Sequence, residues 1–230
     1  APVRQVIGRA TIDLGAAAFA QLRSSYRQLV LDIGTGDGKH VLAVARARPD
    51  ALVVGLDAGP DAMRKAAARA AAKPAKGGTP NALFVWGAVE RLPTELSDVD
   101  EVHSLMPWGS LLRALVAPDE TVLAGVAAAC RPGAPFLVTL NLHAWRPPVP
   151  DVGGTAEPTP KLAASMLAPA YARGGWNLDT ADYPDDAQLA ALGTSWTKRL
   201  GSSRDELAVL ALRGTLGSPA GGSEQPVRAG

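Results

Sequence analysis

The chain has 230 residues, a size at which one domain can enclose a complete hydrophobic core. Its formal net charge of +1 excludes a protein that binds nucleic acid over its whole surface, so any basic surface must be local. The single cysteine, Cys130, excludes an internal disulfide and a cysteine zinc cluster, and suits a reducing cytoplasm. No apolar run approaches the roughly 18 residues of a membrane-spanning helix, so no membrane contact is expected.

The first part of the chain predicts a hairpin, a helix and then a buried strand. Residues 3–12 alternate loosely, with Gly8 and Arg9 at or near the turn, and 16–26 carry helix signals. The segment 30–40 reads V-L-D-I-G-T-G-D-G-K-H. Its apolar start, ending in Asp32, is typical of a buried parallel strand, and V-L-A-V-A-R-A-R after it predicts a helix.

The spacing of Gly34, Gly36 and Gly38 discriminates between nucleotide ligands. A dinucleotide fingerprint, G-x-G-x-x-G, would need glycine where Lys39 stands. A P-loop needs four residues before its Gly-Lys, whereas three separate Gly34 from Gly38. The D-x-G-x-G-x-G form instead resembles motif I of methyltransferases that use S-adenosylmethionine (SAM). The alternative is a glycine-rich turn without a ligand.

Two acids fit a SAM site. Asp32 would lie near the cationic methionine end of that ligand. The next predicted strand, 51–58, contains L-V-V-G-L-D and places Asp57, followed by Ala58, roughly 20 residues further on. An acid there can hold ribose hydroxyls, as a nucleoside-binding unit requires. SAM, with S-adenosyl-L-homocysteine as its product, is therefore the favoured ligand.

A helix over 60–72 carries a basic side. Its cations, continued by Lys73, fall mostly at i, i+4 spacing, with Asp61 as the only acid. A solvated face is one interpretation. The absence of interleaved carboxylates favours the other, a docking surface for an anionic partner.

The remaining pattern predicts a doubly wound α/β sheet. Strands are expected over 82–88, 101–105 and 135–142, and a helix over 119–130, so strand and helix alternate five times. A helix over 161–173, a strand over 176–183, a short helix over 185–192 and an antiparallel last strand over 206–216 follow. Seven strands in this order are typical of a class I SAM-dependent methyltransferase. We expect a single domain over 1–216 and a disordered tail over 217–230.

The carboxyl edge of such a sheet holds the ligand. Asp32, Asp57, Glu90 and the loop M-P-W-G-S at 106–110 would meet there. That loop offers no side-chain acceptor for an amine proton. The indole of Trp108 would instead stack on a planar group, with a core tryptophan as the alternative.

A second tryptophan, Trp196, lies in the late segment T-S-W-T-K-R-L-G-S-S-R. Lys198, Arg199 and Arg204 surround it, as a base-stacking and phosphate-binding segment requires. Trp108 and Trp196 could hold a flipped base between them above the SAM methyl group.

The histidines and the cysteine indicate no separate chemistry. His40, His103 and His143 lack metal-ligand spacing, so no metal is expected. His103 lies within a predicted strand and is interpreted as an interior packing residue rather than a base. Cys130, in a helix of small residues, is interpreted as a structural thiol.

Five segments together identify a family resemblance. They are L-D-I-G-T-G-D-G-K-H, A-A-A-K-P-A-K-G-G, M-P-W-G-S-L-L-R, L-N-L-H-A-W-R-P and T-S-W-T-K-R-L-G-S-S-R, in order over about 4–216. The chain resembles the aminoglycoside-resistance 16S ribosomal RNA methyltransferases of the kanamycin–apramycin type, the KamB and NpmA group. The resemblance implies methyl transfer from SAM to N1 of adenine 1408 (ribosome numbering) in the decoding site of the assembled 30S subunit.

The resemblance also assigns residues. Those implied in SAM binding are Asp32, Gly34, Asp57, Ala88, Glu90, Leu105 and Ser110, with Gly36 and Ala58 beside them. Those implied at the target base are Trp108, Trp196 and Ser195. Those implied in docking rRNA are Arg69, Lys73, Arg146, Arg199 and Arg204.

The implied chemistry agrees with the absence of a candidate base. N1 of neutral adenine has an in-plane lone pair and no proton, so catalysis would depend on positioning the flipped base. We expect a cytoplasmic monomer whose partner is the 30S subunit. The alternatives are a tRNA methyltransferase of the guanine N7 type and a non-catalytic SAM- or RNA-binding module.

Overall fold

The computed structural model of the chain describes residues 2–146, 152, 154–192 and 208–217. Four residues predicted at the target base or in RNA docking lie outside this part: Ser195, Trp196, Arg199 and Arg204. The predicted tail also lies outside it, apart from Gly217.

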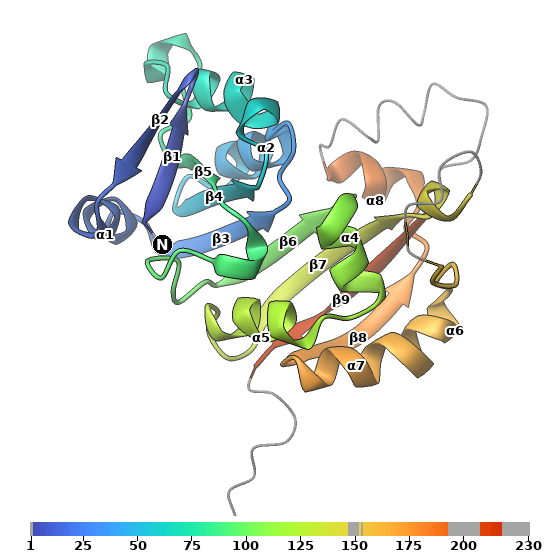
Figure 1. Cartoon of the computed structure of the whole chain (residues 1–230). Helices are drawn as coiled ribbons and strands as arrows, with labels where there is room; N and C mark the ends of the chain where they lie inside the picture. Colours follow the sequence, from blue (N-terminus) through green and yellow to red (C-terminus); the bar gives the residue numbers. More distant parts are fainter. Residues whose placement is uncertain (1, 147–151, 153, 193–207, 218–230) are drawn as a thin grey trace, which may run out of the picture.

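A nine-stranded sheet in the order β2-β1-β5-β4-β3-β6-β7-β9-β8 organises the molecule (Figure 1). Its neighbours from β5 to β7 pair in parallel, and β9 lies antiparallel between β7 and β8. This confirms the predicted mostly parallel sheet with an antiparallel last strand. The strands are β1 (Val3–Ile7), β2 (Ala10–Leu14), β3 (Gln28–Ile33), β4 (Ala51–Asp57), β5 (Ala82–Trp86), β6 (Glu101–Leu105), β7 (Ala134–Asn141), β8 (Trp176–Asp182) and β9 (Val209–Leu216).

The N-terminal hairpin lengthens the sheet. β1 pairs with β2 across the turn at Gly8 and Arg9, and with β5 through Gln5 and Val85, antiparallel in both cases. The seven predicted strands therefore form the body of the sheet, and the hairpin supplies the two strands at one edge.

The helices follow the prediction with one addition. They are α1 (Ala16–Ser24), α2 (Lys39–Ala47), α3 (Pro60–Ala70), α4 (Gly109–Val116), α5 (Glu120–Ala128), α6 (Pro160–Leu162), α7 (Ala168–Arg173) and α8 (Asp186–Ala191). Short helical turns are η1 (Pro74–Lys76), η2 (Val89–Arg91), η3 (Leu142–Trp145) and the π-turn η4 (Ala163–Leu167). Helix α4 was not predicted, because Pro107 and Gly109 indicated only a break in the chain. It begins directly after that break.

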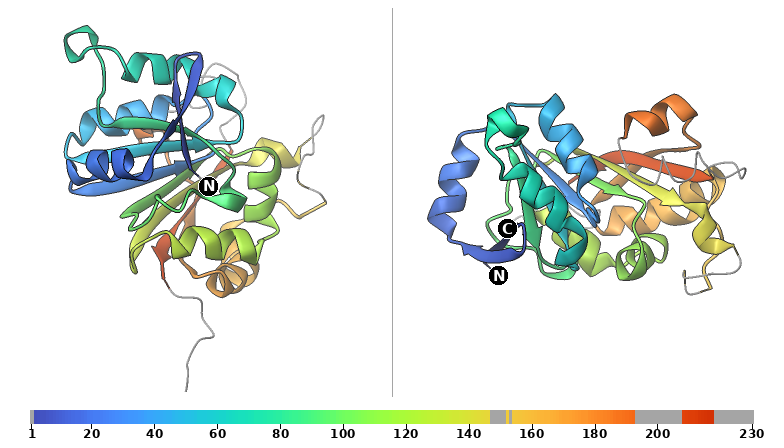
Figure 2. Two further views of the ribbon diagram at one scale, coloured as in Figure 1. Left: turned by 60° about the vertical axis from the view of Figure 1, so that its left-hand side comes forward. Right: turned by 90° about the horizontal axis from the view of Figure 1, so that it is seen from above.

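Helices cover both faces of the central sheet (Figure 2). Alternate residues of the central strands belong to different hydrophobic clusters on these two faces. Val30 of β3 belongs to the cluster that contains Val41 of α2 and Met63 of α3. Its neighbours Leu29 and Leu31 belong to the larger cluster formed with α1, α4, α5 and α7. Since side chains of a strand alternate between faces, an apolar strand of this kind needs helices on both sides. The predicted cover on both faces is confirmed.

Gly38 determines how closely α2 approaches its neighbours. Its φ is +70°, in the left-handed region, and it precedes the first residue of α2. A Cβ there would lie 2.4 Å from Phe84 Cε1 and 2.8 Å from Ala66 Cβ. Both neighbours are buried, so neither can move aside easily. Gly36 also has a positive φ, +55°, but a Cβ there would meet nothing within 4 Å.

We expect Gly38→Ala to lower the free energy of unfolding by about 2–4 kcal/mol, from left-handed backbone strain together with overpacking. Gly36→Ala isolates the backbone contribution and should lower it by about 1–2 kcal/mol. Urea denaturation of both variants measures the difference. Equal losses would show that the contact with Phe84 and Ala66 is unimportant.

Candidate functional site

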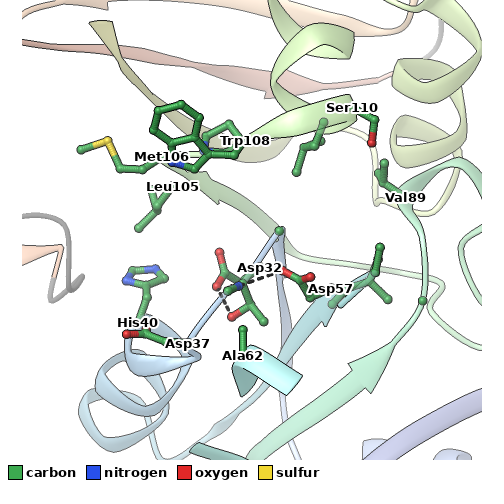
Figure 3. Close-up of a pocket in the computed structure, with 18 of the residues that line it drawn as sticks. Asp32, Asp37, His40, Asp57, Ala62, Val89, Leu105, Met106, Trp108 and Ser110 are labelled. Carbon is green, nitrogen blue, oxygen red and sulfur yellow. Dashed lines mark hydrogen bonds between the residues drawn. The ribbon is translucent and has the colours of Figure 1, made fainter. Parts of the chain in front are cut away.

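The strand order places a crevice at the carboxyl ends of the central strands. From β3 the chain builds β4 and β5 on one side, and then β6 and β7 on the other. Connections leave β3 and β6 in opposite directions at such a point, which opens a crevice between them. A cavity of about 450 Å³ lies there (Figure 3).

The cavity brings together most of the residues predicted to bind the cofactor. On its wall lie Asp32, Gly34, Gly36, Asp57, Ala58, Glu90, Leu105 and Ser110, together with Trp108. Ala88 does not line the cavity, although its neighbours Gly87 and Val89 do. Figure 3 shows Asp32 and Asp57 on one side, with Leu105 and Trp108 across from them.

Asp57 holds the glycine loop in place. Its Oδ2 accepts a hydrogen bond from the Gly36 N–H at 2.9 Å, and its Oδ1 accepts one from the Gly59 N–H at 2.8 Å. One carboxylate at the end of β4 therefore connects the loop after β3 to the turn after β4. Hydrogen bonds to a charged acceptor are among the stronger ones, which favours a preformed loop.

Asp32 presents an unpartnered carboxylate oxygen. The side chain is 2% exposed, and its Oδ2 accepts a hydrogen bond from Thr35 Oγ1 at 2.7 Å. Its Oδ1 is buried and has no partner. Burial raises the pKa of this carboxyl, and nearby His40 and the Thr35 hydroxyl oppose that shift. An orphaned acceptor in the cavity wall fits a ligand that carries an ammonium group.

A strained turn directs Trp108 to the cavity. Met106 has a φ of +52°, which is uncommon for a residue with a side chain. Its backbone N–H is held by the Thr139 carbonyl oxygen at 2.9 Å and by Thr139 Oγ1 at 3.2 Å. Trp108 follows with 37% of its surface exposed, so it is not a core tryptophan. Strain of this kind persists where the surrounding structure overrides it, often at functional sites.

The docking residues that the structure describes lie on the surface. Arg69 and Lys73 are exposed at the C-terminal end of α3 and just beyond it. Arg146 is also exposed, but it forms an ion pair with Glu157 at 3.4 Å. The first two are the simpler candidates for contact with an anionic partner.

Sequence reasoning missed His40, which lines the cavity. Its signal was position, because it follows the glycine loop in the first turn of α2. His103, predicted as an interior residue, is buried and hydrogen bonded to both His40 and Glu101, which confirms that interpretation. Within the described part of the chain, no three His, Cys, Asp or Glu side chains gather closely enough to hold a metal ion.

Comparison with known proteins identifies the family. The sequence profile of the family described as "NpmA: 16S rRNA (adenine(1408)-N(1))-methyltransferase" matches residues 4–215. The chain belongs to this family. It is therefore an enzyme of the methyltransferase class, as the five sequence segments implied.

Individual members of this family align over nearly their whole length. A 16S rRNA (adenine(1408)-N(1))-methyltransferase of Streptoalloteichus tenebrarius is 56% identical over 93% of this chain and 99% of its own. The crystal structure of the 16S rRNA methyltransferase KamB is 56% identical, with a TM-score of 0.88 over 94% of this chain and 100% of its own.

A variant from Catenulisporales acidiphilia, solved with the cosubstrate SAM, is 32% identical, with a TM-score of 0.82 over 96% of this chain and 100% of its own. These similarities cover both halves of the sheet. The class I methyltransferase fold predicted from the sequence is thereby confirmed. In the ranges that the structure describes, no helix is long and apolar enough to cross a lipid bilayer.

The cost of burying the Asp32 carboxylate makes the free energy of unfolding depend on pH. Because burial raises the pKa of Asp32 in the folded state, the folded protein loses stability as pH rises from the unfolded-state pKa, about 3.9, through the folded-state value. We expect Asp32→Asn to raise the melting temperature at pH 7, by an amount that shrinks as the pH falls toward about 4.

Asp57→Asn is the matched control. An amide has only one acceptor oxygen, so it cannot receive both backbone N–H groups that Asp57 holds. This variant should lower the melting temperature by roughly 2–4 °C, from the loss of one hydrogen bond worth about 1 kcal/mol. Thermal unfolding of both variants provides the comparison. A fall in melting temperature for Asp32→Asn at pH 7 would contradict the account given for Asp32.

Proposed function

We propose that this enzyme transfers the methyl group of SAM to N1 of adenine 1408 of 16S rRNA, in the decoding site of the assembled 30S subunit. Resistance to aminoglycosides of the kanamycin and apramycin type follows from that modification. The observation that carries the proposal is one cavity with the orphaned Asp32 carboxylate on one wall and Trp108 on the other, in a chain that belongs to this family. The SAM complex of a structural relative supports the choice of cofactor.

Different residues around the cavity are assigned to different parts of SAM. Asp32 Oδ1 is free to accept the ammonium group of the methionine end. Asp57 stands where ribose hydroxyls would be held, and Ala58, Ala88 and Glu90 belong to the turns around an adenine. Gly34, Gly36, Leu105 and Ser110 complete the proposed binding set. When bound, SAM supplies an electrophilic methyl group on a sulfonium.

Positioning of the target base is the proposed source of catalysis. N1 of adenine attacks with its own lone pair and loses no proton, so the chain needs to provide alignment and exclusion of water rather than a base. We assign stacking on the flipped adenine to Trp108 and Trp196, with Ser195 beside the reacting centre. The exposed position of Trp108 at the cavity supports this assignment.

Docking on the ribosome is assigned to cations on two parts of the chain. Arg69, Lys73 and Arg146 belong to the described part, and Arg199 and Arg204 to the segment around Trp196. Arginine and lysine bind phosphates without reading sequence, so they would orient the enzyme on folded rRNA. The 30S subunit places the reaction in the cytoplasm, and a monomeric enzyme remains our prediction.

Incubation with radiolabelled SAM and unmethylated 30S subunits, followed by reverse transcription, tests the function. A methyl group on N1 blocks Watson–Crick pairing, so a new stop beside adenine 1408 is expected. Label in 30S without that stop would displace the target base. Label in tRNA alone would favour the guanine N7 tRNA enzyme, and no label in either RNA would favour a non-catalytic binding module.

Replacement of Trp108 tests the stacking role. Stacking of a base on an aromatic ring is worth about 1–3 kcal/mol, so we expect Trp108→Ala to reduce turnover on 30S by roughly 5- to 150-fold. Trp108→Phe keeps a ring and should retain most of the activity. Trp196→Ala should abolish modification while SAM still binds, as calorimetry can show. Normal turnover in both alanine variants would exclude the base-stacking assignment.

A further inference from the structure

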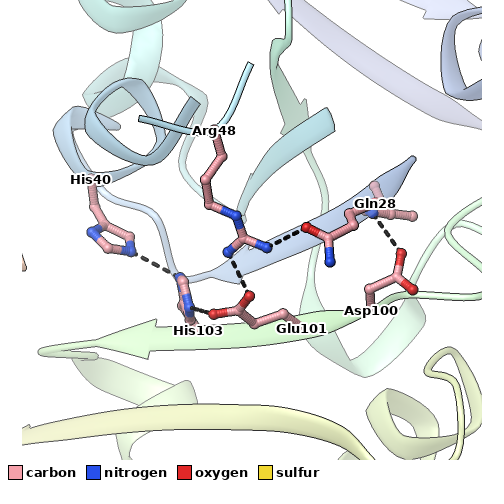
Figure 4. A network of polar contacts seen from close by, with 7 residues as sticks. Gln28, His40, Arg48, Asp100, Glu101 and His103 are labelled. Carbon is pink, nitrogen blue, oxygen red and sulfur yellow. Dashed lines mark hydrogen bonds and ion pairs between the residues drawn. The ribbon is translucent and has the colours of Figure 1, made fainter. Parts of the chain in front are cut away.

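A chain of hydrogen bonds runs from Leu192, directly after α8, through two histidines to Arg48, directly after α2. Figure 4 shows its part from His40 to Arg48. His40 Nδ1 lies 2.6 Å from the Leu192 carbonyl oxygen, and His40 Nε2 lies 2.9 Å from His103 Nδ1. His103 Nε2 lies 2.7 Å from Glu101 Oε1. Glu101 Oε2 then accepts from Arg48 Nη1 at 2.5 Å. Both ring nitrogens of both histidines are therefore engaged.

The protons in this chain can be counted. A carbonyl oxygen and a carboxylate can only accept, so His40 must donate to Leu192 and His103 must donate to Glu101. Each neutral imidazole carries one proton, and these two bonds use both. The bond between the rings needs a third proton, because without it two lone pairs would face each other at 2.9 Å. The two imidazoles together must therefore carry one positive charge.

The third proton does not come from Glu101. The pKa of Glu101 is lowered to about 2, chiefly by its hydrogen bond from His103, so Glu101 stays ionised and cannot supply the third proton. Burial lowers the pKa of His40, which disfavours a charge on that ring.

The charges that face the two rings balance. Asp32 from β3 and Glu101 from β6 are negative, and Arg48 beyond α2 and the shared proton are positive. Asp37 lies near His40 at the exposed rim and is ion-paired with Lys39 at 3.0 Å. From α8 the rings meet the backbone carbonyl of Leu192 rather than a charged side chain. With the shared proton on the two rings, the two carboxylates of Asp32 and Glu101 are balanced by that proton and by Arg48.

The acceptor at the end of this chain, the Leu192 carbonyl oxygen, lies directly after α8, the helix that packs against Met106. Leu189 of α8 is buried in one cluster with Met106 and Val209, and Leu192 packs against that cluster. Met106 is the strained residue two positions before Trp108. The bond from His40 to Leu192 therefore joins α2 to the helix that supports Met106.

We propose that His40 is a positioning residue for methyl transfer: one proton shared with His103 lets it hold α8 against Met106, and so keeps Trp108 in place. The expected effect on methyl transfer rests on the proposed function. The proton count and the anchoring of α8 are independent of that function. Loss of the proton as pH rises leaves two lone pairs opposed, so one bond of the chain must break. The chain of bonds is complete only while the two rings share one proton, and it loses a bond when rising pH removes that proton.

Nitrogen NMR of the free enzyme tests the proton count without any substrate. The chain has three histidines, so ¹⁵N-histidine labelling gives few signals, and His143→Gln identifies those of the third ring. At about pH 7, near the usual histidine range, we expect three of the four nitrogens of His40 and His103 to show protonated shifts. Two protonated nitrogens of the four would overturn the proposal.

Two substitutions of His40 distinguish the effect of its hydrogen bond to Leu192 from the effect of its ring volume. In His40→Asn the amide Nδ2 takes the place of ring Nδ1 and can donate to Leu192 at every pH. His40→Phe fills the space and donates nothing. Amide hydrogen exchange in α8 should be faster in His40→Phe than in His40→Asn, by about three- to tenfold for one net hydrogen bond. Equal exchange in the two variants would overturn the anchoring role.

The pH profile of kcat on 30S subunits completes the test. Between about pH 6 and pH 9 the unchanged enzyme and the control His143→Gln should both decline as pH rises. His40→Asn should hold its kcat over that range, and His40→Phe should be about three- to tenfold lower throughout. A decline in His40→Asn that parallels the unchanged enzyme would overturn the proposal. If neither the unchanged enzyme nor any variant methylates 30S subunits, the proposed function is contradicted. The NMR and hydrogen-exchange results do not depend on that activity, because they are measured on the free enzyme.

Discussion

A carboxylate buried at the carboxyl end of a central strand is the constraint around which this site is arranged. Asp32 is almost fully enclosed, and one of its oxygens has no partner. Removing such a group from water is costly unless charges and donors replace the water. Thr35 supplies one donor, and the histidine pair supplies the nearest positive charge. The remaining acceptor faces the cavity, where a cationic ligand would complete the balance.

The second acid has the opposite character. Asp57 is satisfied in the free enzyme, since both of its oxygens receive backbone N–H groups. Asp57 shapes the glycine loop, whereas Asp32 keeps one buried acceptor oxygen without a partner. The two aspartates at the ends of neighbouring parallel strands therefore contribute in different ways. Asp57 fixes the geometry of the pocket, and Asp32 leaves it with an uncompensated acceptor. That division fits a cofactor that is cationic at one end and a nucleoside at the other.

The cavity wall opposite the two aspartates is formed by a restrained turn that fixes the position of Trp108. The turn at Met106 is strained, and three separate contacts restrain it: the backbone and the hydroxyl of Thr139, and the apolar packing of Leu189. Such a restrained turn presents Trp108 at the cavity with little freedom. A reaction in which the nucleophile brings its own lone pair benefits most from rigid placement of this kind.

The sequence by itself determined the α/β class, the parallel core with its antiparallel last strand, and the two acids beside the glycine loop. It could do so because these depend on local periodicity and on spacing along one βαβ unit. It missed α4, because Pro107 and Gly109 are also the residues of a simple break. It also missed the role of His40, which lies 63 residues from its partner His103 along the chain. Only the tertiary structure decided that contact, the orphaned oxygen of Asp32 and the support of Met106 by α8, because each depends on side chains that pairing of distant strands and packing of helices bring together.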